Sequence, residues 1–128
     1  MKFTEHLNPG VNLIRRYEPG RVYVNDQAIK QSCIVSQHHL LADWPVFDMQ
    51  DLSQQNLMTL SDLKPEVLIL GTGESQIFPP ASVMQFFIQQ GISLEVMTND
   101  AACRTYNILT TEDREVVIAL IMQPANAK

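Results

Sequence analysis

The chain has 128 residues, the usual size of one compact domain and too short for two independent cores. Hydrophobic residues make up 45% of it, enough to fill an interior without a metal or disulfide, and we expect no cofactor. A net charge of -5 excludes the broad basic surface of nonspecific nucleic-acid binding. Cys33 and Cys103 lie far apart without metal-ligand spacing, which indicates a reducing compartment.

The charge is unevenly distributed along the chain. Residues 1–30 hold five basic and three acidic side chains, whereas residues 31–103 hold eight acidic side chains and one lysine. This pattern predicts a basic N-terminal segment and an acidic body. Arg15, Arg16 and Arg21 form a candidate basic surface for a partner.

Neither a targeting segment nor a transmembrane segment is expected. Residues 1–9 contain Lys2, Glu5 and His6 and lack the apolar run of a signal peptide. The longest apolar stretch, Val116–Met122, has seven residues, far below the roughly 20 that span a bilayer. We therefore expect a cytoplasmic protein.

The N-terminal region, residues 11–35, predicts a β-hairpin followed by a third strand. Two apolar-rich segments, Val11–Tyr17 and Arg21–Val24, flank Glu18-Pro19-Gly20, in which proline and glycine suit a type II turn. Alternation over Gln27–Val35 predicts one strand with Ile29, Cys33 and Val35 facing inward. The Cys33 thiol is then a small buried hydrophobic group.

Residues 36–64 are less regular and predict a long connection. We expect a short strand around Trp44–Phe47 and a helical turn near Ser61–Leu63. His38 and His39 do not suggest a metal site, because neighbouring residues in a strand point to opposite faces.

Residues 65–123 alternate between strand and helix patterns. The wholly apolar Val67–Leu70 predicts a strand buried on both faces. Ala101, Thr105 and Ile108 are expected on one face of the last helix. The other elements expected here are a helix from Pro79 and Pro80 to Gly91, a strand at Ile92–Met97, that last helix at Asp100–Leu109 and a central strand at Val116–Met122. Such units favour an α/β fold with partly parallel strands, and residues 124–128 are expected to be a loose tail.

The ends of two predicted parallel strands point to a crevice. Gly71-Thr72-Gly73 follows one strand, and Thr98 and Asn99 follow the next, so both lie at the same sheet edge. Arg104 in the first turn of the following helix adds positive charge, and an anionic small molecule or a partner's carboxylate would fit there. The alternative is that the glycines only make a tight strand exit, with Arg104 paired to Asp100 or Glu74.

Known nucleotide-binding motifs do not match at this place. The third glycine of a dinucleotide fingerprint would fall at Gln76, and the P-loop lysine is missing. Cys103 near the helix N-terminus could form a reactive thiolate, but no histidine follows it in the sequence, and packing is the default role. We assign no catalytic and no metal-binding residue.

Two segments resemble a family of domains of unknown function. Leu-Ile-Leu-Gly-Thr-Gly at 68–73 and Ala-Ala-Cys-Arg-Thr-Tyr-Asn-Ile-Leu at 101–109 are similar to the family that includes mitochondrial respiratory complex I assembly factor 3 and the adipogenesis-associated Mth938 domain-containing protein. The resemblance implies a single three-layer α/β domain with a mixed sheet and no established enzymatic activity. It draws attention to Gly71, Gly73, Cys103, Arg104, Tyr106 and Asn107.

The resemblance also implies a location and a function. The mitochondrial members help assemble complex I at the inner membrane, and this chain looks like a bacterial member because it lacks a presequence. We expect it to be cytoplasmic, or peripheral to the inner membrane through a partner.

Two classes of function follow. The first is a noncatalytic, assembly-factor-like domain that binds a partner protein through the crevice or the basic hairpin. The second is a small-molecule binding protein or enzyme of unknown reaction that uses the crevice. An exposed hairpin edge would also allow pairing with a second copy.

Overall fold

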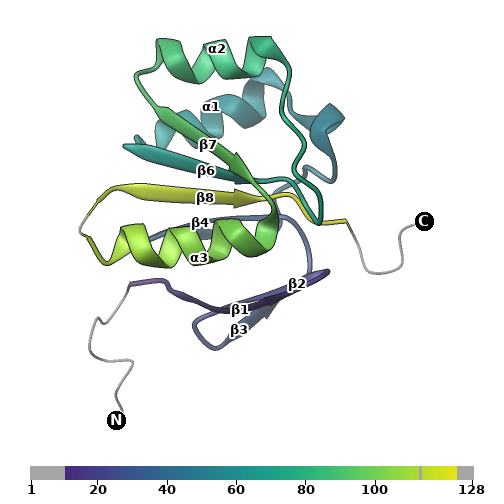
Figure 1. Cartoon of the computed structure of the whole chain (residues 1–128), viewed down its shortest axis with the longest axis vertical. Helices are drawn as coiled ribbons and strands as arrows, with labels where there is room; N and C mark the ends of the chain where they lie inside the picture. Colours follow the sequence, from purple (N-terminus) through teal and green to yellow (C-terminus); the bar gives the residue numbers. More distant parts are fainter. Residues whose placement is uncertain (1–10, 113, 124–128) are drawn as a thin grey trace.

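The computed structural model describes residues 11–112 and 114–123 (Figure 1). The expected tail at 124–128 and the N-terminal residues 1–9 lie outside the described residues. The strands are β1 (Ile14–Glu18), β2 (Arg21–Val24), β3 (Gln27–Ile29), β4 (Cys33–Ser36), β5 (Leu40–Leu41), β6 (Val67–Gly71), β7 (Ser93–Met97) and β8 (Val116–Leu120). The helices are the 3-10 helix η2 (Met49–Asp51) and the α-helices α1 (Gln54–Asp62), α2 (Ala81–Gln89) and α3 (Asn99–Thr110).

The first three strands form an antiparallel sheet, β1-β2-β3. Glu18 pairs with Arg21 across the predicted turn, and Gly20 has a φ of 80°, which glycine adopts without strain. The hairpin prediction is therefore confirmed. Asn25, with a φ of 54°, makes the second turn.

The remaining strands form a mixed five-stranded sheet in the order β5-β4-β8-β6-β7. β6 is parallel to both β7 and β8, whereas β4 is antiparallel to β8 and to β5. β6 and β8 are buried along their whole length, as expected of strands covered on both faces. The predicted α/β class with a partly parallel sheet is confirmed.

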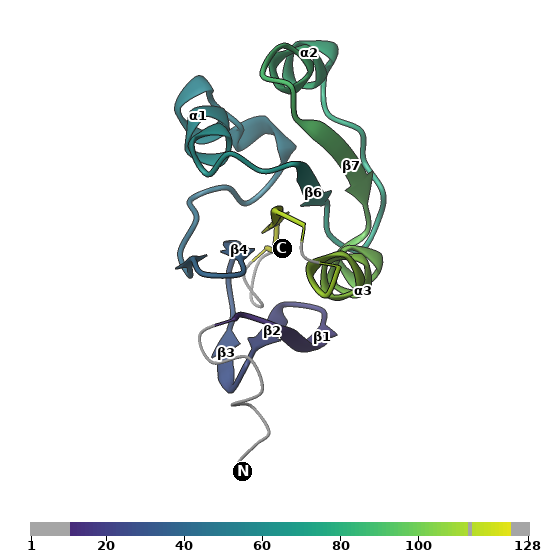
Figure 2. The same ribbon diagram turned by 90° about the vertical axis from the view of Figure 1, so that its left-hand side faces the viewer.

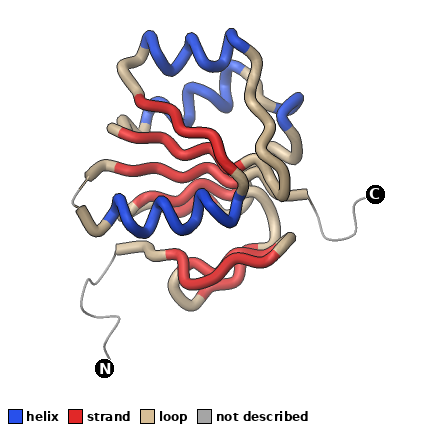
Figure 3. Tube along the Cα trace, viewed as in Figure 1, coloured by secondary structure: helices blue, strands red, loops and turns tan. Residues whose placement is uncertain are grey.

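The molecule has three layers, as expected. Helices α1 and α2 cover one face of the large sheet, and α3 together with the small sheet covers the other (Figures 1 and 2). Leu68 and Leu70 of β6 face α1 and α2, while Val67 and Ile69 face α3. Figure 3 shows the strands of the small sheet in red beside α3, apart from the strands of the large sheet.

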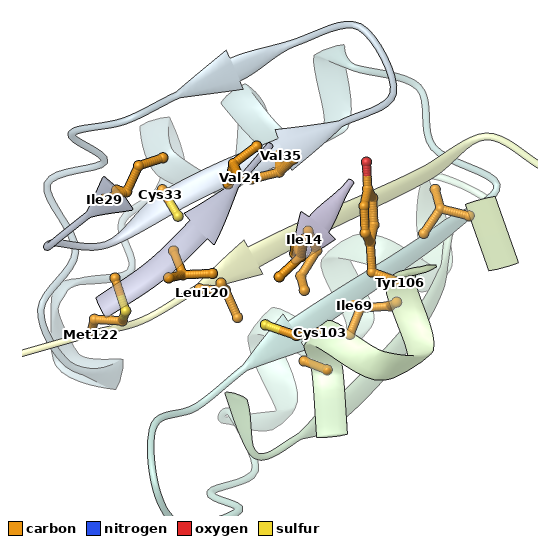
Figure 4. Close-up of a cluster of buried hydrophobic side chains, with 14 of the residues drawn as sticks. Ile14, Val24, Ile29, Cys33, Val35, Ile69, Cys103, Tyr106, Leu120 and Met122 are labelled. Atoms are coloured by element: carbon orange, nitrogen blue, oxygen red, sulfur yellow. The ribbon is translucent and has the colours of Figure 1, made fainter. Parts of the chain in front are cut away.

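The core between the large sheet, α3 and the small sheet contains both cysteines. Figure 4 shows Cys33 and Cys103 among apolar side chains such as Val24, Val35 and Leu120. Burial raises the pKa of the Cys33 thiol to about 12. The predicted structural role of Cys33 agrees with this placement.

The expectation of one strand over Gln27–Val35 is wrong. β3 ends at Ile29 and belongs to the small sheet, whereas β4 begins at Cys33 and belongs to the large one. Ser32 is buried at this crossing, and its hydroxyl has hydrogen-bond partners there. It accepts from the backbone N–H of Met122 at 2.7 Å and lies within hydrogen-bond reach of the carbonyl oxygens of Val46 and Met122. Ile34 is also buried, since β4 is covered on both faces.

The connection between β4 and β6 also differs from the expectation. The short strand expected around Trp44–Phe47 is wrong: Trp44 and Val46 lie in an irregular segment, and their side chains join the core cluster that also contains Leu57 and Leu60 of α1. A full helix, α1, replaces the expected turn at Ser61–Leu63, and the Ser53 side chain caps it by accepting from the N–H of Asn56.

The last helix, α3, lies where it was expected, and the structure shows which of its faces is buried. Ala102, Cys103 and Tyr106 are buried, whereas Ile108 is 60% exposed. The buried face of α3 packs against β6 and β8 of the large sheet and against β1 of the small one. Among the described residues, no helix has the length and apolar character to cross a bilayer.

We predict that Ser32→Ala lowers the free energy of unfolding by about 1–3 kcal/mol, because it leaves the buried N–H of Met122 without its acceptor. Urea denaturation followed by circular dichroism measures the change. The exposed Ser82 on α2 supplies the matched control, Ser82→Ala, which should change stability by less than about 0.5 kcal/mol. Equal effects of the two substitutions would contradict the role given to Ser32.

Candidate functional site

The carboxyl ends of β6 and β8 open into a cleft of about 470 Å³. Its described walls come from the tip of the β1–β2 hairpin, the segment entering η2, the loop after β6 and the chain after β8, with Asn99 of α3. In Figure 1 these segments meet where the arrowheads of β6 and β8 point. Small-molecule and peptide sites commonly occur at this edge of α/β sheets.

A buried amide, that of Asn99, organises the cleft floor. Its Oδ1 accepts from the N–H of Gly73 at 3.0 Å, and its Nδ2 donates to the carbonyl oxygen of Ile121 at 3.0 Å and to the Tyr17 hydroxyl at 3.2 Å. The backbone N–H of Asn99 donates to the carbonyl oxygen of Gly73 at 2.9 Å. One side chain therefore joins the β6 loop, the chain after β8 and the hairpin.

Gly71 is required because Asn99 lies directly against it. A Cβ at position 71 would lie 2.3 Å from Asn99 Oδ1 and 2.7 Å from Leu120 Cδ2. Gly73 has a φ of 94°, which favours glycine for a different reason. Gly71 is thus needed for the close approach of the Asn99 side chain, and Gly73 for a left-handed backbone conformation.

The Tyr17 hydroxyl connects the hairpin to the loop after β6. It donates a short hydrogen bond to the Glu74 carboxylate while accepting from Asn99. Burial and the Glu74 contact raise the pKa of Tyr17 well above its ordinary value. Tyr17 therefore stays protonated at neutral pH and acts as a hydrogen-bond donor.

Thr72 shapes the loop that carries Glu74. Its Oγ1 donates to the carbonyl oxygen of Ser75 at 2.6 Å and accepts from the N–H of Ile77 at 3.0 Å. Since the loop closes on the Thr72 hydroxyl, Ile77 is held at the cleft wall.

The cleft is acidic. Its described lining contains the carboxylates of Asp48 and Glu74 and lacks lysine, arginine and histidine. Neither carboxylate forms an ion pair within the part of the chain that the structure describes. The negative potential favours a cationic group over the anion considered from the sequence.

Arg104 lies outside this lining. Its guanidinium pairs with Asp100 one helical turn earlier, and both side chains are 66% exposed. This pairing is the alternative that the sequence left open. One of the free backbone N–H groups at the start of α3 also has a partner, because the Thr98 side chain accepts from the N–H of Ala101 at 3.4 Å.

The other predicted crevice residues separate into two groups. Thr72, Gly73 and Asn99 line the cleft, whereas Gly71 is buried beside it. Thr98, Cys103, Arg104 and Asn107 do not appear among its described walls.

Asn107 joins α3 to β1. Its side chain accepts from the N–H of Ile14 at 3.0 Å and donates to the carbonyl oxygen of Ile14 at 2.6 Å, as a neighbouring strand would. Asn107 thereby covers part of the β1 edge and fixes the hairpin against α3.

Burial raises the pKa of the Cys103 thiol to about 12, and the neighbouring Cys33 and Asp100 add to the effect while Arg104 opposes it. The thiol is therefore protonated at neutral pH. A reactive thiolate at Cys103 does not fit this environment.

The three hairpin arginines have local partners. Arg15 lies 3.8 Å from Asp26, Arg16 lies 3.3 Å from Glu18 and stacks on the Tyr23 ring, and Arg21 donates to the Tyr23 hydroxyl at 3.3 Å. Arg15 and Arg16 are exposed, so the basic surface stays a prediction.

Sequence reasoning missed Tyr17, Asp48 and Glu74 as a group. They come from three distant segments, and no spacing rule brings them together. Within the described residues, no group of three or more histidine, cysteine, aspartate or glutamate side chains could hold a metal ion.

The chain matches a family model over residues 14–121, described as a protein of unknown function (DUF498/DUF598). It belongs to this family. The resemblance drawn from residues 68–73 and 101–109 is thereby confirmed.

Relatives and a solved structure agree with this assignment. The chain is 33% identical over 118 residues to NADH dehydrogenase (ubiquinone) 1 alpha subcomplex assembly factor 3 of Danio rerio, covering 91% of this chain and 67% of that protein. It is 31% identical over 108 residues to a 13 kDa major membrane protein of Francisella tularensis, covering 84% and 88%. A Mth938-like domain of Bordetella pertussis superposes with a TM-score of 0.80 at 25% identity, covering 98% and 96%.

We predict that Gly71→Ala destabilises the fold by about 1–3 kcal/mol, because the new Cβ overlaps the Asn99 amide and Leu120. Thermal or urea unfolding measures the loss. In the double variant Gly71→Ala/Asn99→Ala the overlap with the amide is removed, so the combined loss should be smaller than the sum of the two single losses. If the two single losses add up to the loss of the double variant, the contact with the Asn99 amide is not what restricts position 71 to glycine.

The cysteine pKa values predict a loss of stability in alkali. Unfolded thiols ionise near pH 8.5, while folded Cys33 and Cys103 hold their protons to about pH 12. The folded state then binds more protons, so the free energy of unfolding falls as pH rises from about 9 towards 12, by up to about 1.4 kcal/mol per pH unit for each thiol.

Urea unfolding under reducing conditions at a series of pH values measures this dependence. Cys103→Ala should give a shallower decline than the wild type, whatever its effect at neutral pH. Identical declines would assign the alkaline loss to other groups.

Proposed function

We propose that this protein is a noncatalytic, assembly-factor-like domain that binds a partner protein through the cleft. The observation that carries the proposal is the open cleft at the carboxyl ends of β6 and β8, walled by four distant segments and tied together by Asn99. Such a site presents a preformed surface, which lowers the cost of ordering it on binding.

The cleft chemistry suits binding better than covalent catalysis. Its described lining lacks histidine, cysteine and lysine, and the buried thiol of Cys103 stays protonated at neutral pH. Tyr17 is held as a hydrogen-bond donor, and its high pKa disfavours its use as a base. The lining thus offers recognition groups without an activated nucleophile.

The names of relatives support the same class of function. Several are named as assembly factors for NADH dehydrogenase, and we extend to this chain the capacity to hold a protein during assembly of a larger complex. We also propose a cytoplasmic location, with attachment to the inner membrane through the partner.

A photoreactive benzophenone amino acid in place of Phe47 or Ile77 should crosslink the partner in intact cells. Both side chains line the cleft, and they are 38% and 50% exposed. The control position is Met58 on α1, which is 49% exposed and outside the cleft lining. We expect a protein adduct from positions 47 and 77 that is missing or much weaker from position 58.

The exposed Arg16 tests the basic hairpin as the alternative surface. An adduct from position 16 without one from 47 or 77 would move the contact to the hairpin. No protein adduct from any of these positions, in variants that fold normally, would overturn the protein-binding function.

A further inference from the structure

We propose that the cleft receives a lysine or arginine side chain from an apolar-flanked segment of the partner protein. This inference rests on the proposed protein-binding function and names the chemical group that the cleft recognises. It stands on the cavity, on two carboxylates without basic partners and on an exposed apolar rim.

The two carboxylates come from segments on different walls. Asp48 precedes η2 and accepts from the N–H of Gln50 at 2.9 Å, and Glu74 follows β6 and accepts from the Tyr17 hydroxyl. In the described structure, the other carboxylate oxygen of Glu74 has no donor. Both side chains are thus fixed by hydrogen bonds, and neither has a basic partner among the described residues.

Three described arginines are paired with acidic residues elsewhere. Arg15, Arg16 and Arg104 pair with Asp26, Glu18 and Asp100, respectively. No described basic side chain lines the cleft. Within the described residues the cleft therefore lacks a cationic complement, so a cationic group from a partner would fit it and an anion would be repelled.

The rim favours an organic cation over a bare metal ion. Phe47 and Ile77 are 38% and 50% exposed at the cleft, and Met49 lies beside them. These side chains offer apolar contact to the methylene stem of lysine or arginine and to apolar neighbours in the partner segment. A hydrated divalent cation would gain nothing from such a rim.

The first test uses small probes with isotope-labelled protein and amide NMR. Butylguanidinium and butylammonium represent the two side chains, and butyrate is the anionic control of similar size. We expect the cations to shift the amide signals of Gly73 and Glu74 and to bind about tenfold more tightly than butyrate. Their binding should weaken with added salt.

Variants assign the effect to the cleft carboxylates. Glu74→Gln keeps an acceptor for the Tyr17 hydroxyl but removes the charge, and it should weaken cation binding about three- to tenfold. Asp48→Asn should act in the same direction. Glu95→Gln, at an exposed carboxylate on β7 outside the cleft lining, is the matched control and should leave binding unchanged.

The second test uses displayed random heptapeptides selected on the wild-type protein. Selected peptides should be enriched in lysine or arginine next to apolar residues, and the enrichment should disappear on the Asp48→Asn/Glu74→Gln variant. These outcomes, with the NMR result, would support the inference.

Other outcomes would overturn it in distinguishable ways. Butyrate binding as tightly as the cations, or peptides without basic enrichment that still bind, would refute the cleft chemistry while protein binding stands. Concentration-dependent shifts of the Gly73 amide without any probe, lost in Glu74→Gln, would make a second copy the occupant. If no probe and no peptide binds, the inference is refuted. If the crosslinking also yields no protein adduct, the proposed protein-binding function is refuted as well.

Discussion

The Asn99 side chain joins three parts of the chain that the sequence keeps far apart. The side chain is fully buried. Its amide accepts a hydrogen bond from the loop after β6 and donates to the chain after β8 and to the Tyr17 hydroxyl of the hairpin. Leaving such groups unpaired in the interior is costly, so the three segments are held in one arrangement. Gly71 is a consequence of this contact, because only a residue without Cβ leaves room for the amide.

The cleft depends on that arrangement. The Tyr17 hydroxyl donates to Glu74 while it accepts from the Asn99 amide, and this pair of hydrogen bonds fixes the hairpin tip at the cleft. Ser32 acts similarly on the other wall, where it links Met122 to the segment that leads to Asp48. Two buried polar side chains thus position a mostly exposed acidic site.

Burial also decides the chemistry of the cysteines and of Tyr106. These groups lie in the core between the large sheet, α3 and the small sheet, and burial raises their pKa values. The nearby charge of Arg104 is too weak and too exposed to reverse this effect at Cys103. A motif that looks reactive in the sequence is therefore a packing element in the fold.

The local sequence signals were sufficient for much of the fold. Proline and glycine at 19 and 20 specify the hairpin turn, the apolar run at 67–70 specifies a doubly buried strand, and Thr98 marks the start of α3. The break at Ser32 was missed, since an alternating pattern continues through it while the chain changes sheets. Helix α1 was missed as well, because its glutamines and asparagine dilute the apolar pattern.

The sequence by itself determined the α/β class, the main strands and the glycine-rich exit from β6, because turn chemistry and apolar periodicity are local properties. Only the tertiary structure decided which side chains meet at that exit. It brought Tyr17, Asp48 and Glu74 together and directed Arg104 to Asp100, so the crevice became acidic. Charge at a site depends on contacts between distant segments, and the net charge of a sequence segment does not contain that information.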